Sequence, residues 1–371
     1  MRLATHRNLC AALLLLWGAL GAVADADLSA LMKLSNVAIL PFANLAETPD
    51  ATVPVMMRVR SELTRKTVAL ADSNSVAGAL RKYRVRNTSE LDLAETQSVA
   101  LESSSRYLLT GSIDRYATGD STAEVALSAR LLDVGAGTIV WANSVALHKD
   151  PRVNFLGLGS HRVDWLAKDA VHELFESFRL QFPLRMKMVQ AIRQKGKTPP
   201  ELPCRKVLLV TFGNESDTHF AGNILANELL SAMLRRGFTL VDPGRVRETM
   251  LDSRELMQGE ISTDLLKKCR DELGADFVLT GTVSRFESVR DASFDDPAVA
   301  FEARLVDTQR GDLVWAKTYT RDGRDAAWMF DIGFVHGLAV LSEHLSRHVA
   351  DDLPVRRARM THTTPVQEQN P

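Results

Sequence analysis

The chain has 371 residues, of which 45% are apolar and 25% charged, and its 45 Lys and Arg residues nearly cancel its 46 Asp and Glu residues. This length suffices for two domains of ordinary size. The balanced charge argues against nucleic-acid binding, because phosphate binding normally needs a concentrated basic face.

The first 26 residues have the composition of a secretory signal peptide. Arg2 and Arg7 precede a short apolar run at 9–20, and small residues at 22–26 fit a cleavage site. No apolar run reaches the roughly 20 residues that span a bilayer. Cys10 stands at the start of the run and not at the cleavage point, so we expect no lipidation. We expect a soluble periplasmic protein without a transmembrane segment.

The remaining chain carries one pattern twice. The two halves keep the same order at a spacing of 170 residues, which becomes 174 after one surface insertion, and this predicts two copies of one fold. The corresponding segments are VAILPFAN (37–44) with VLLVTFGN (207–214), YLLTGSIDRY (107–116) with FVLTGTVSRF (277–286), and RLLDVGAGTIVWANS (130–144) with RLVDTQRGDLVWAKT (304–318).

Periodicity predicts the elements of each copy, and the pattern is clearest in the second. The predicted order is a strand at 207–212, a helix from 220 ended by Gly237, a short strand at 238–241, a turn at 242–244, helices at 245–251 and 263–273, strands at 277–286, 299–305 and 312–319, and a closing helix at 334–349. The fold class is therefore α/β, an α+β mixed sheet with flanking helices, in two tandem copies of a small domain.

The two copies, together with the predicted signal peptide, linker and tail, divide the chain into five segments. They are a signal peptide at 1–26, a first domain at 27–182, a linker rich in Lys, Gly and Pro at 183–203, a second domain at 204–353, and a disordered tail at 354–371.

Two repeated positions could belong either to the core or to a binding surface. Gly111 and Gly281 lie inside the repeated strand, where a glycine can leave room for a packed helix, mark a bulge or let a ligand approach. We favour packing, because no charged or nucleophilic group accompanies them. Trp141 and Trp315 could be exposed anchors, but each lies in an apolar run, which favours a core role.

Two carboxylates also stand at corresponding positions, but the turns explain them. Asp133 and Asp307 each begin a turn that Gly137 or Gly311 completes, and Asp can bond its own backbone there. Because they belong to different copies, we do not expect a catalytic pair.

No set of side chains predicts an enzyme, a metal or a cofactor. His344 and His348 are spaced as metal ligands often are, but no third ligand accompanies them, so we expect two solvated histidines. After signal cleavage Cys204 and Cys269 remain, and in an oxidising compartment they could form a disulfide or stay as two buried thiols. The sequence leaves both alternatives open.

The repeated motifs resemble a domain shared by several bacterial envelope proteins. These are the curli-secretion lipoprotein CsgG, the penicillin-binding-protein activator LpoB, the flagellar proteins FlgO and FlgT, and the N-terminal domain of TolB. The second copy carries Gly274-Ala275-Asp276 before the strand, whereas the first has Ser104-Ser105-Arg106 and is a degenerate version. The resemblance implies a non-enzymatic domain that binds other envelope proteins.

We therefore expect a periplasmic adaptor or scaffold in secretion, peptidoglycan synthesis or a flagellar-type assembly, with an oligomer as an open option. The alternative is a periplasmic protein that holds a small ligand in the cleft between its two domains.

Overall fold

The computed structural model describes residues 36–118, 123–149, 163–178, 206–253, 261–291, 294–325 and 334–354. The predicted signal peptide and linker and nearly all of the predicted tail lie outside these ranges, as does Cys204, so the predictions about them stay predictions. Within the described ranges, no helix is long and apolar enough to cross a membrane. The chain has an α+β fold, with two mixed sheets and flanking helices.

The first sheet has the order β1-β3-β4-β5, with β2 also paired to β3. β1 and β2 run parallel to β3, and β3, β4 and β5 are antiparallel neighbours. The strands are Val37–Ile39 (β1), Ala43–Asn44 (β2), Tyr107–Thr118 (β3), Ala123–Asp133 (β4) and Thr138–Lys149 (β5).

The second sheet repeats this arrangement in the order β11-β10-β9-β6-β8, with β7 paired to β9. β6 and β7 run parallel to β9, and β9, β10 and β11 are antiparallel. The strands are Lys206–Leu209 (β6), Gly213–Asn214 (β7), Thr239–Leu240 (β8), Phe277–Asp291 (β9), Phe294–Asp307 (β10) and Leu313–Asp322 (β11). In the first half, a single bridge between Val37 and Leu70 stands where the second half has β8.

The helices also occupy corresponding places in the two halves. The first half contains Thr52–Arg65 (α2), Ser73–Lys82 (α3), Leu93–Glu102 (α4) and Val163–Leu174 (α5), and the second contains Ala221–Arg235 (α7), Pro243–Asp252 (α8), Thr263–Leu273 (α9) and Leu338–Asp352 (α10).

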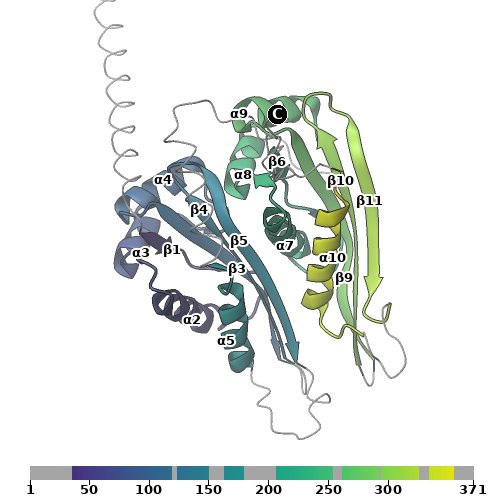
Figure 1. Cartoon of the computed structure of the whole chain (residues 1–371), viewed down its shortest axis with the longest axis horizontal. Helices are drawn as coiled ribbons and strands as arrows, with labels where there is room; N and C mark the ends of the chain where they lie inside the picture. The colour runs from purple at the N-terminus through teal and green to yellow at the C-terminus, as the bar shows by residue number, and fades with distance from the viewer. Residues whose placement is uncertain are drawn as a thin grey trace, which may run out of the picture.

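The main elements stack in four layers (Figure 1). α2 and α5 cover one face of the first sheet, and α7 and α10 lie between the two sheets, in contact with strands of both. On the opposite side of the second sheet, α8 and α9 form a smaller hydrophobic cluster with Val278 of β9 and Val306 of β10 at one end of the sheet. Every residue of β4 is buried, because helices cover both faces of its sheet, whereas most of β11 is exposed.

The helix boundaries depend on local caps, and one of them corrects the sequence prediction. Asp242-Pro243-Gly244 does not form a separate turn but opens α8, since the Asp242 carboxylate accepts from the Gly244 N–H and Pro243 occupies the first helical position. Gly274 ends α9 at a φ of +63°, and Gly237 follows α7 at a φ of +87°. Phe334 precedes α10 and is not part of it.

The core of the first half lies between its sheet and the helices α2 and α5. Trp141 is fully buried there and packs on the rings of Phe175 and Phe178, with centroid distances of 5.5 Å and 4.9 Å. The corresponding core of the second half extends across α7 and α10 and includes Leu132, Ile139 and Ala142 of the first half. The two halves therefore share one hydrophobic cluster.

Candidate functional site

The repeated glycines make room for an aromatic ring, and not for a helix or a ligand. A Cβ on Gly111 would lie 2.6 Å from the Phe42 ring and 2.5 Å from the Ser128 carbonyl oxygen. A Cβ on Gly281 would lie 2.4 Å from the Phe212 ring and 2.0 Å from the Glu302 carbonyl oxygen. The predicted packing role is thus fulfilled by a phenylalanine of the VAILPF or VLLVTF segment.

The other repeated residues also have structural roles. Asp307 accepts the N–H groups of Gln309 and Arg310 in the turn before β11, at 2.8 Å and 3.0 Å. Gly137 and Gly311 adopt φ values of +61° and +74°, which favour glycine. Trp315 is partly buried against the core of the second half.

Asp133 has a second partner besides its turn. Its carboxylate is fully buried and pairs with Arg106, with 2.7 Å between Nη2 and Oδ2. Arg106 stands where the second half has Asp276, which accepts the Lys206 N–H instead. The departure of the first half from the Gly-Ala-Asp pattern therefore supplies a buried ion pair.

The predicted histidine and cysteine positions do not form a chemical site. Among the described residues, no group of His, Cys, Asp and Glu could hold a metal ion. His344 and His348 are both exposed on α10, as expected, and partial burial lowers the pKa of His344. Cys269 is buried at 3% exposure, and Cys204 lies outside the described residues, so both alternatives, a disulfide or two buried thiols, stay predictions.

The main polar site is the junction, which we define as the surface where α7 and α10 meet the first sheet. Ser112, Ser128 and Ser144 lie side by side there across β3, β4 and β5. Asn227 of α7 donates to the Ser112 hydroxyl at 3.0 Å. Sequence analysis missed these residues, because serines on a strand resemble a solvated face.

Asp114 lies at a bulge of β3 within this junction. Its carboxylate accepts from the hydroxyls of Ser112 and Ser128 at 2.6 Å and 2.5 Å, and only 2% of the residue is exposed. Burial raises the pKa of Asp114 to about 7, although its hydrogen bonds oppose this shift. This carboxyl group therefore titrates near neutral pH.

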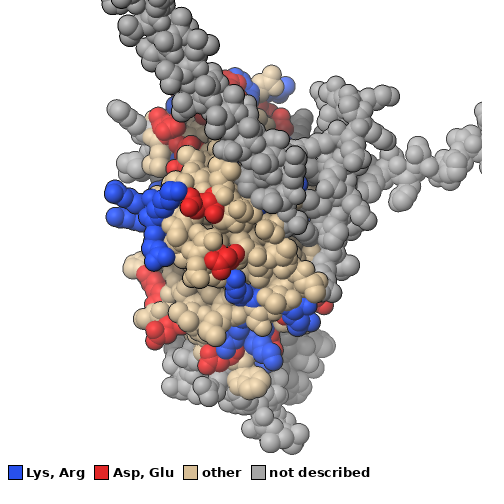
Figure 2. All heavy atoms as spheres, turned by 90° about the vertical axis from the view of Figure 1, so that its left-hand side faces the viewer, with Lys and Arg blue, Asp and Glu red and all other residues tan. Residues whose placement is uncertain are grey.

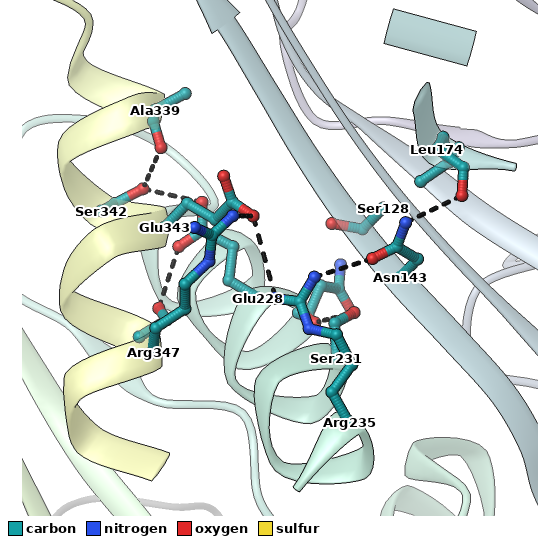
Figure 3. Close-up of polar contacts among 12 residues, drawn as sticks. Ser128, Asn143, Leu174, Glu228, Ser231, Arg235, Ala339, Ser342, Glu343 and Arg347 are labelled. Atoms are coloured by element: carbon teal, nitrogen blue, oxygen red, sulfur yellow. Dashed lines mark hydrogen bonds and ion pairs between the residues drawn. The ribbon is translucent and has the colours of Figure 1, made fainter. Parts of the chain in front are cut away.

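Glu228 of α7 is a second buried carboxyl group, facing α10 (Figure 3). It accepts from the hydroxyls of Ser342 and Ser346 at 2.7 Å and 3.0 Å. Burial raises the pKa of Glu228 well above its ordinary value, and the charge of Asp114 adds to this shift. The two helices between the sheets are thus joined by a carboxyl group that favours its protonated form.

Arginines connect the same network to the edge of the first sheet (Figure 3). Arg235 of α7 donates to the Asn143 side chain at 2.8 Å, and the Asn143 amide donates to the Leu174 carbonyl at the end of α5. Arg347 pairs with Glu343 on α10 at 2.5 Å. Polar contacts therefore run from α5 through the first sheet to α7 and on to α10, since Arg235 also forms an ion pair with Glu343 at 3.9 Å.

Two further contacts hold the second half on the first sheet. Arg130 of β4 pairs with Asp242 at the start of α8, with 3.1 Å between Nε and Oδ1, and both side chains are less than a tenth exposed. Glu124 accepts the Ala339 N–H at 2.9 Å and so caps α10 from the other half. These contacts pair polar groups across the junction, whereas the buried hydroxyls of Thr110 and Ser144 have no hydrogen-bond partner among the described residues.

The junction leaves little empty space. The pocket between Arg130, Asn227 and Pro243 has a volume of about 20 Å³, which is room for about one water molecule. Small-molecule sites usually enclose about 300 Å³ or more. This pocket does not favour the alternative of a small ligand held between the halves.

The outer face of the second sheet is the side of β9, β10 and β11 that points away from α7 and α10. Arg304, Ala316, Thr318 and Thr320 are exposed on it. At the start of β11, Leu313 and Val314 are 58% and 45% exposed. Among the described residues, β11 pairs with β10 alone, so it forms one end of its sheet.

Comparison with known proteins places a similarity on the second half. Residues 169–320 match the family model described as peptidoglycan-synthase activator LpoB. No curated protein matches the chain. The matched segment includes Gly274-Ala275-Asp276 and strands β9 and β10, so it covers the copy with the fuller motif. The match supports an LpoB-like envelope domain, whereas the predicted resemblance to CsgG, FlgO and TolB stays a prediction.

Three solved structures are similar to parts of this chain. The PelC dodecamer of Paraburkholderia phytofirmans has 21% identity and a TM-score of 0.31, and the alignment covers 43% of this chain and 94% of PelC. Lipoprotein GNA1162 of Neisseria meningitidis has 18% identity, a TM-score of 0.29 and coverages of 40% and 99%. The LpoB C-terminal domain of Escherichia coli has 19% identity, a TM-score of 0.25 and coverages of 36% and 93%.

Proposed function

We propose that this protein is a non-enzymatic periplasmic adaptor that binds other cell-envelope proteins, and that a peptidoglycan synthase is among its partners. The observation that carries this proposal is the match of residues 169–320 to the peptidoglycan-synthase activator family. We also propose that the chain consists of two tandem domains, at 27–182 and 204–353, and that the second domain recognises the partner.

The end strand β11 supports a binding role for the second half. An extended partner segment can add to the end strand of a sheet, where main-chain hydrogen bonds supply affinity and side-chain pockets supply specificity. Most residues of β11 are exposed. Lys317 and Arg321 lie on this strand, and charges there limit unspecific pairing of end strands. We infer that β11 contacts the partner.

Photocrosslinking can test this contact in the periplasm of the source cells. A photoreactive residue at Arg321 on β11 should link the chain to a peptidoglycan synthase. The same residue at Arg270 of α9, whose side chain is 41% exposed, is the matched control and should give no such product. Mass spectrometry of the linked peptides identifies both partners.

A reconstituted assay tests the proposed effect on the partner. The exported full chain should change the rate at which the purified synthase polymerises glycan, and it should show no polymerising activity alone. Absence of any crosslinked envelope protein together with an unchanged synthase rate would contradict the proposal. Crosslinking to an envelope protein of another class would support the adaptor function but would identify a partner other than a peptidoglycan synthase.

A further inference from the structure

The two sheets carry the same row of residues at corresponding positions. In the first sheet the row crosses β3, β4 and β5, and in the second it crosses β9, β10 and β11 in the same register. The first row is Thr110, Arg130 and Ala142, and the second is Thr280, Arg304 and Ala316.

All three residues of the first row are buried, whereas in the second row Thr280 is buried at 7% exposure and the other two residues are exposed. Arg130 and Ala142 are 6% and 1% exposed, because the second half lies on this face of the first sheet. Arg304 pairs with Glu302 and its side chain is 44% exposed, and Ala316 is also exposed. The outer face of the second sheet therefore presents a surface whose counterpart is an interface within the same chain.

The ion pair of the covered interface also has an exposed counterpart. Arg130 binds Asp242, which caps α8. The residue 170 positions before Asp242 is Asp72, which caps α3 by accepting the Ser75 N–H at 2.9 Å. Asp72 is exposed. One molecule thus presents Arg304 on its sheet face and Asp72 on its opposite side.

α7, which covers one face of the first sheet, corresponds to α2, which lies beside Asp72. α7 corresponds to α2 at the spacing of 170, so Met57 stands where α7 has Asn227, the residue that contacts Ser112. Arg60 of α2 donates to the Ala71 carbonyl, which places Asp72 next to this helix. α2 and Asp72 thus repeat the arrangement of α7 and Asp242.

Large apolar side chains are exposed on this side of the molecule. Val53 and Met57 lie one helical turn apart on α2, and each is 69% exposed. Trp165 of α5 is 56% exposed, and the ion pair between Arg58 and Asp164 brings its turn of α5 next to Met57. Figure 2 shows that uncharged residues cover much of the described part of this side, with a few acidic groups among them and further charged groups at its margins.

We propose that two copies of this chain associate head to tail, with the outer face of the second sheet bound to α2 and Asp72 of the next copy. Arg304 of one copy then pairs with Asp72 of the other, as Arg130 pairs with Asp242 within the chain. Met57 packs on Thr282, the counterpart of Ser112, and buries its thioether against the threonine methyl group. In a pair of copies, each copy still has one unbound surface, so further copies can add in the same way and form a closed ring or an open stack.

One corner of the interface differs from the junction. Within the chain, a Cβ on Gly244 would lie 1.8 Å from the Leu91 carbonyl oxygen. The counterpart of Gly244 is Asn74, whose side chain excludes so close an approach. In the proposed contact between copies, the sheet face, the helix and the ion pair therefore correspond to those of the junction. Near Asn74 the two copies lie farther apart than the two halves do near Gly244.

The mass of the exported full chain in solution, measured over a concentration series, tests the association. The wild type should form species larger than a monomer as its concentration rises. Arg304→Gln removes one charge of the pair, and Asp72→Asn removes the other while it keeps an oxygen that caps α3. Each should weaken association about tenfold or more, as expected for a hydrogen bond between charged groups.

Two stronger variants test the head-to-tail geometry. Arg304→Glu blocks the sheet face, and Met57→Glu blocks the α2 side, so each alone should stay monomeric. Their equimolar mixture should form a dimer and no larger species, because one unaltered pair of faces remains. Leu101→Glu on α4, at a residue that is 39% exposed, is the matched control and should associate like the wild type.

Circular dichroism and thermal unfolding establish that every variant is folded. A wild type that stays monomeric at its highest soluble concentration would overturn the proposal. If the wild type associates but the mixture of Arg304→Glu and Met57→Glu forms no dimer, the proposed geometry is wrong. The measurement uses no envelope partner, so its outcome is independent of the proposed adaptor function.

Discussion

Replacement of Asp114 by asparagine should remove much of the pH dependence of this protein's stability. Asp114 is buried at the junction, where two hydroxyl groups donate to it, and burial raises its pKa to about 7. Asparagine has the same shape and keeps one oxygen acceptor. It has no proton to lose, so it separates the charge of this group from its packing.

The direction follows from proton linkage. The carboxyl group of an unfolded Asp has a pKa of about 3.9, so the folded chain retains a proton that the unfolded chain releases. This contribution to stability is fully present below about pH 4 and is lost as the pH rises through about 7. A shift of about three pKa units corresponds to about 4 kcal/mol in total, of which about 3 kcal/mol falls between about pH 5 and pH 8.

Denaturant unfolding of the wild type and Asp114→Asn at about pH 5 and pH 8 measures this difference. The free energy of unfolding of the variant, relative to the wild type, should rise by about 3 kcal/mol between the two pH values. Asp264→Asn, at a side chain that is 87% exposed, is the matched control and should follow the wild type. If Asp114→Asn and the wild type kept a constant difference, the assignment of a buried, protonated Asp114 would be wrong.

Four further substitutions test the packing of the core, of a helix and of the junction. Trp141→Ala should lower the free energy of unfolding by about 3–5 kcal/mol in the same denaturant assay, because it leaves a cavity beside Phe175. Gly281→Ala should destabilise strongly, since its Cβ would meet a carbonyl oxygen at 2.0 Å, whereas Gly78→Ala on α3, with nothing within 4 Å, should stabilise by about 0.5–1 kcal/mol. Arg130→Met should cost about 3–5 kcal/mol in thermal or denaturant unfolding, because it leaves the Asp242 carboxylate buried without its cation.

The elements of each half could be predicted from the sequence because their signals are local. Apolar periodicity predicted the strands and helices, and the Asp307 and Gly311 turn requires residue types that favour it. The start of α8 was missed, because Asp-Pro-Gly is compatible with both a turn and a helix start, and the packing of the helix decides between them.

The junction could not be predicted, because its polar residues are explained only by the other half. Ser112 and Ser128 alternate with apolar residues, as expected for a strand with one solvated face. Asp114 is buried because α7 and α10, from a distant part of the chain, cover that face, and Glu228 of α7 is buried where α7 packs on α10. Sequence periodicity shows that one face of a strand is polar, but it does not show what covers that face.

The differences between the halves explain why the first copy departs from the family pattern. Arg106 replaces the acidic residue of the Gly-Ala-Asp motif and pairs with the buried Asp133. Asp114 corresponds to the exposed Ser284 of the second half, and Ser128 to Glu302. In this chain, Arg106 and Asp114 have structural roles in the first sheet, one in a buried ion pair and the other at the junction with the second half. Because the sheet that stays open belongs to the half that matches the LpoB family, we expect mutations that abolish partner binding without unfolding the chain to gather there.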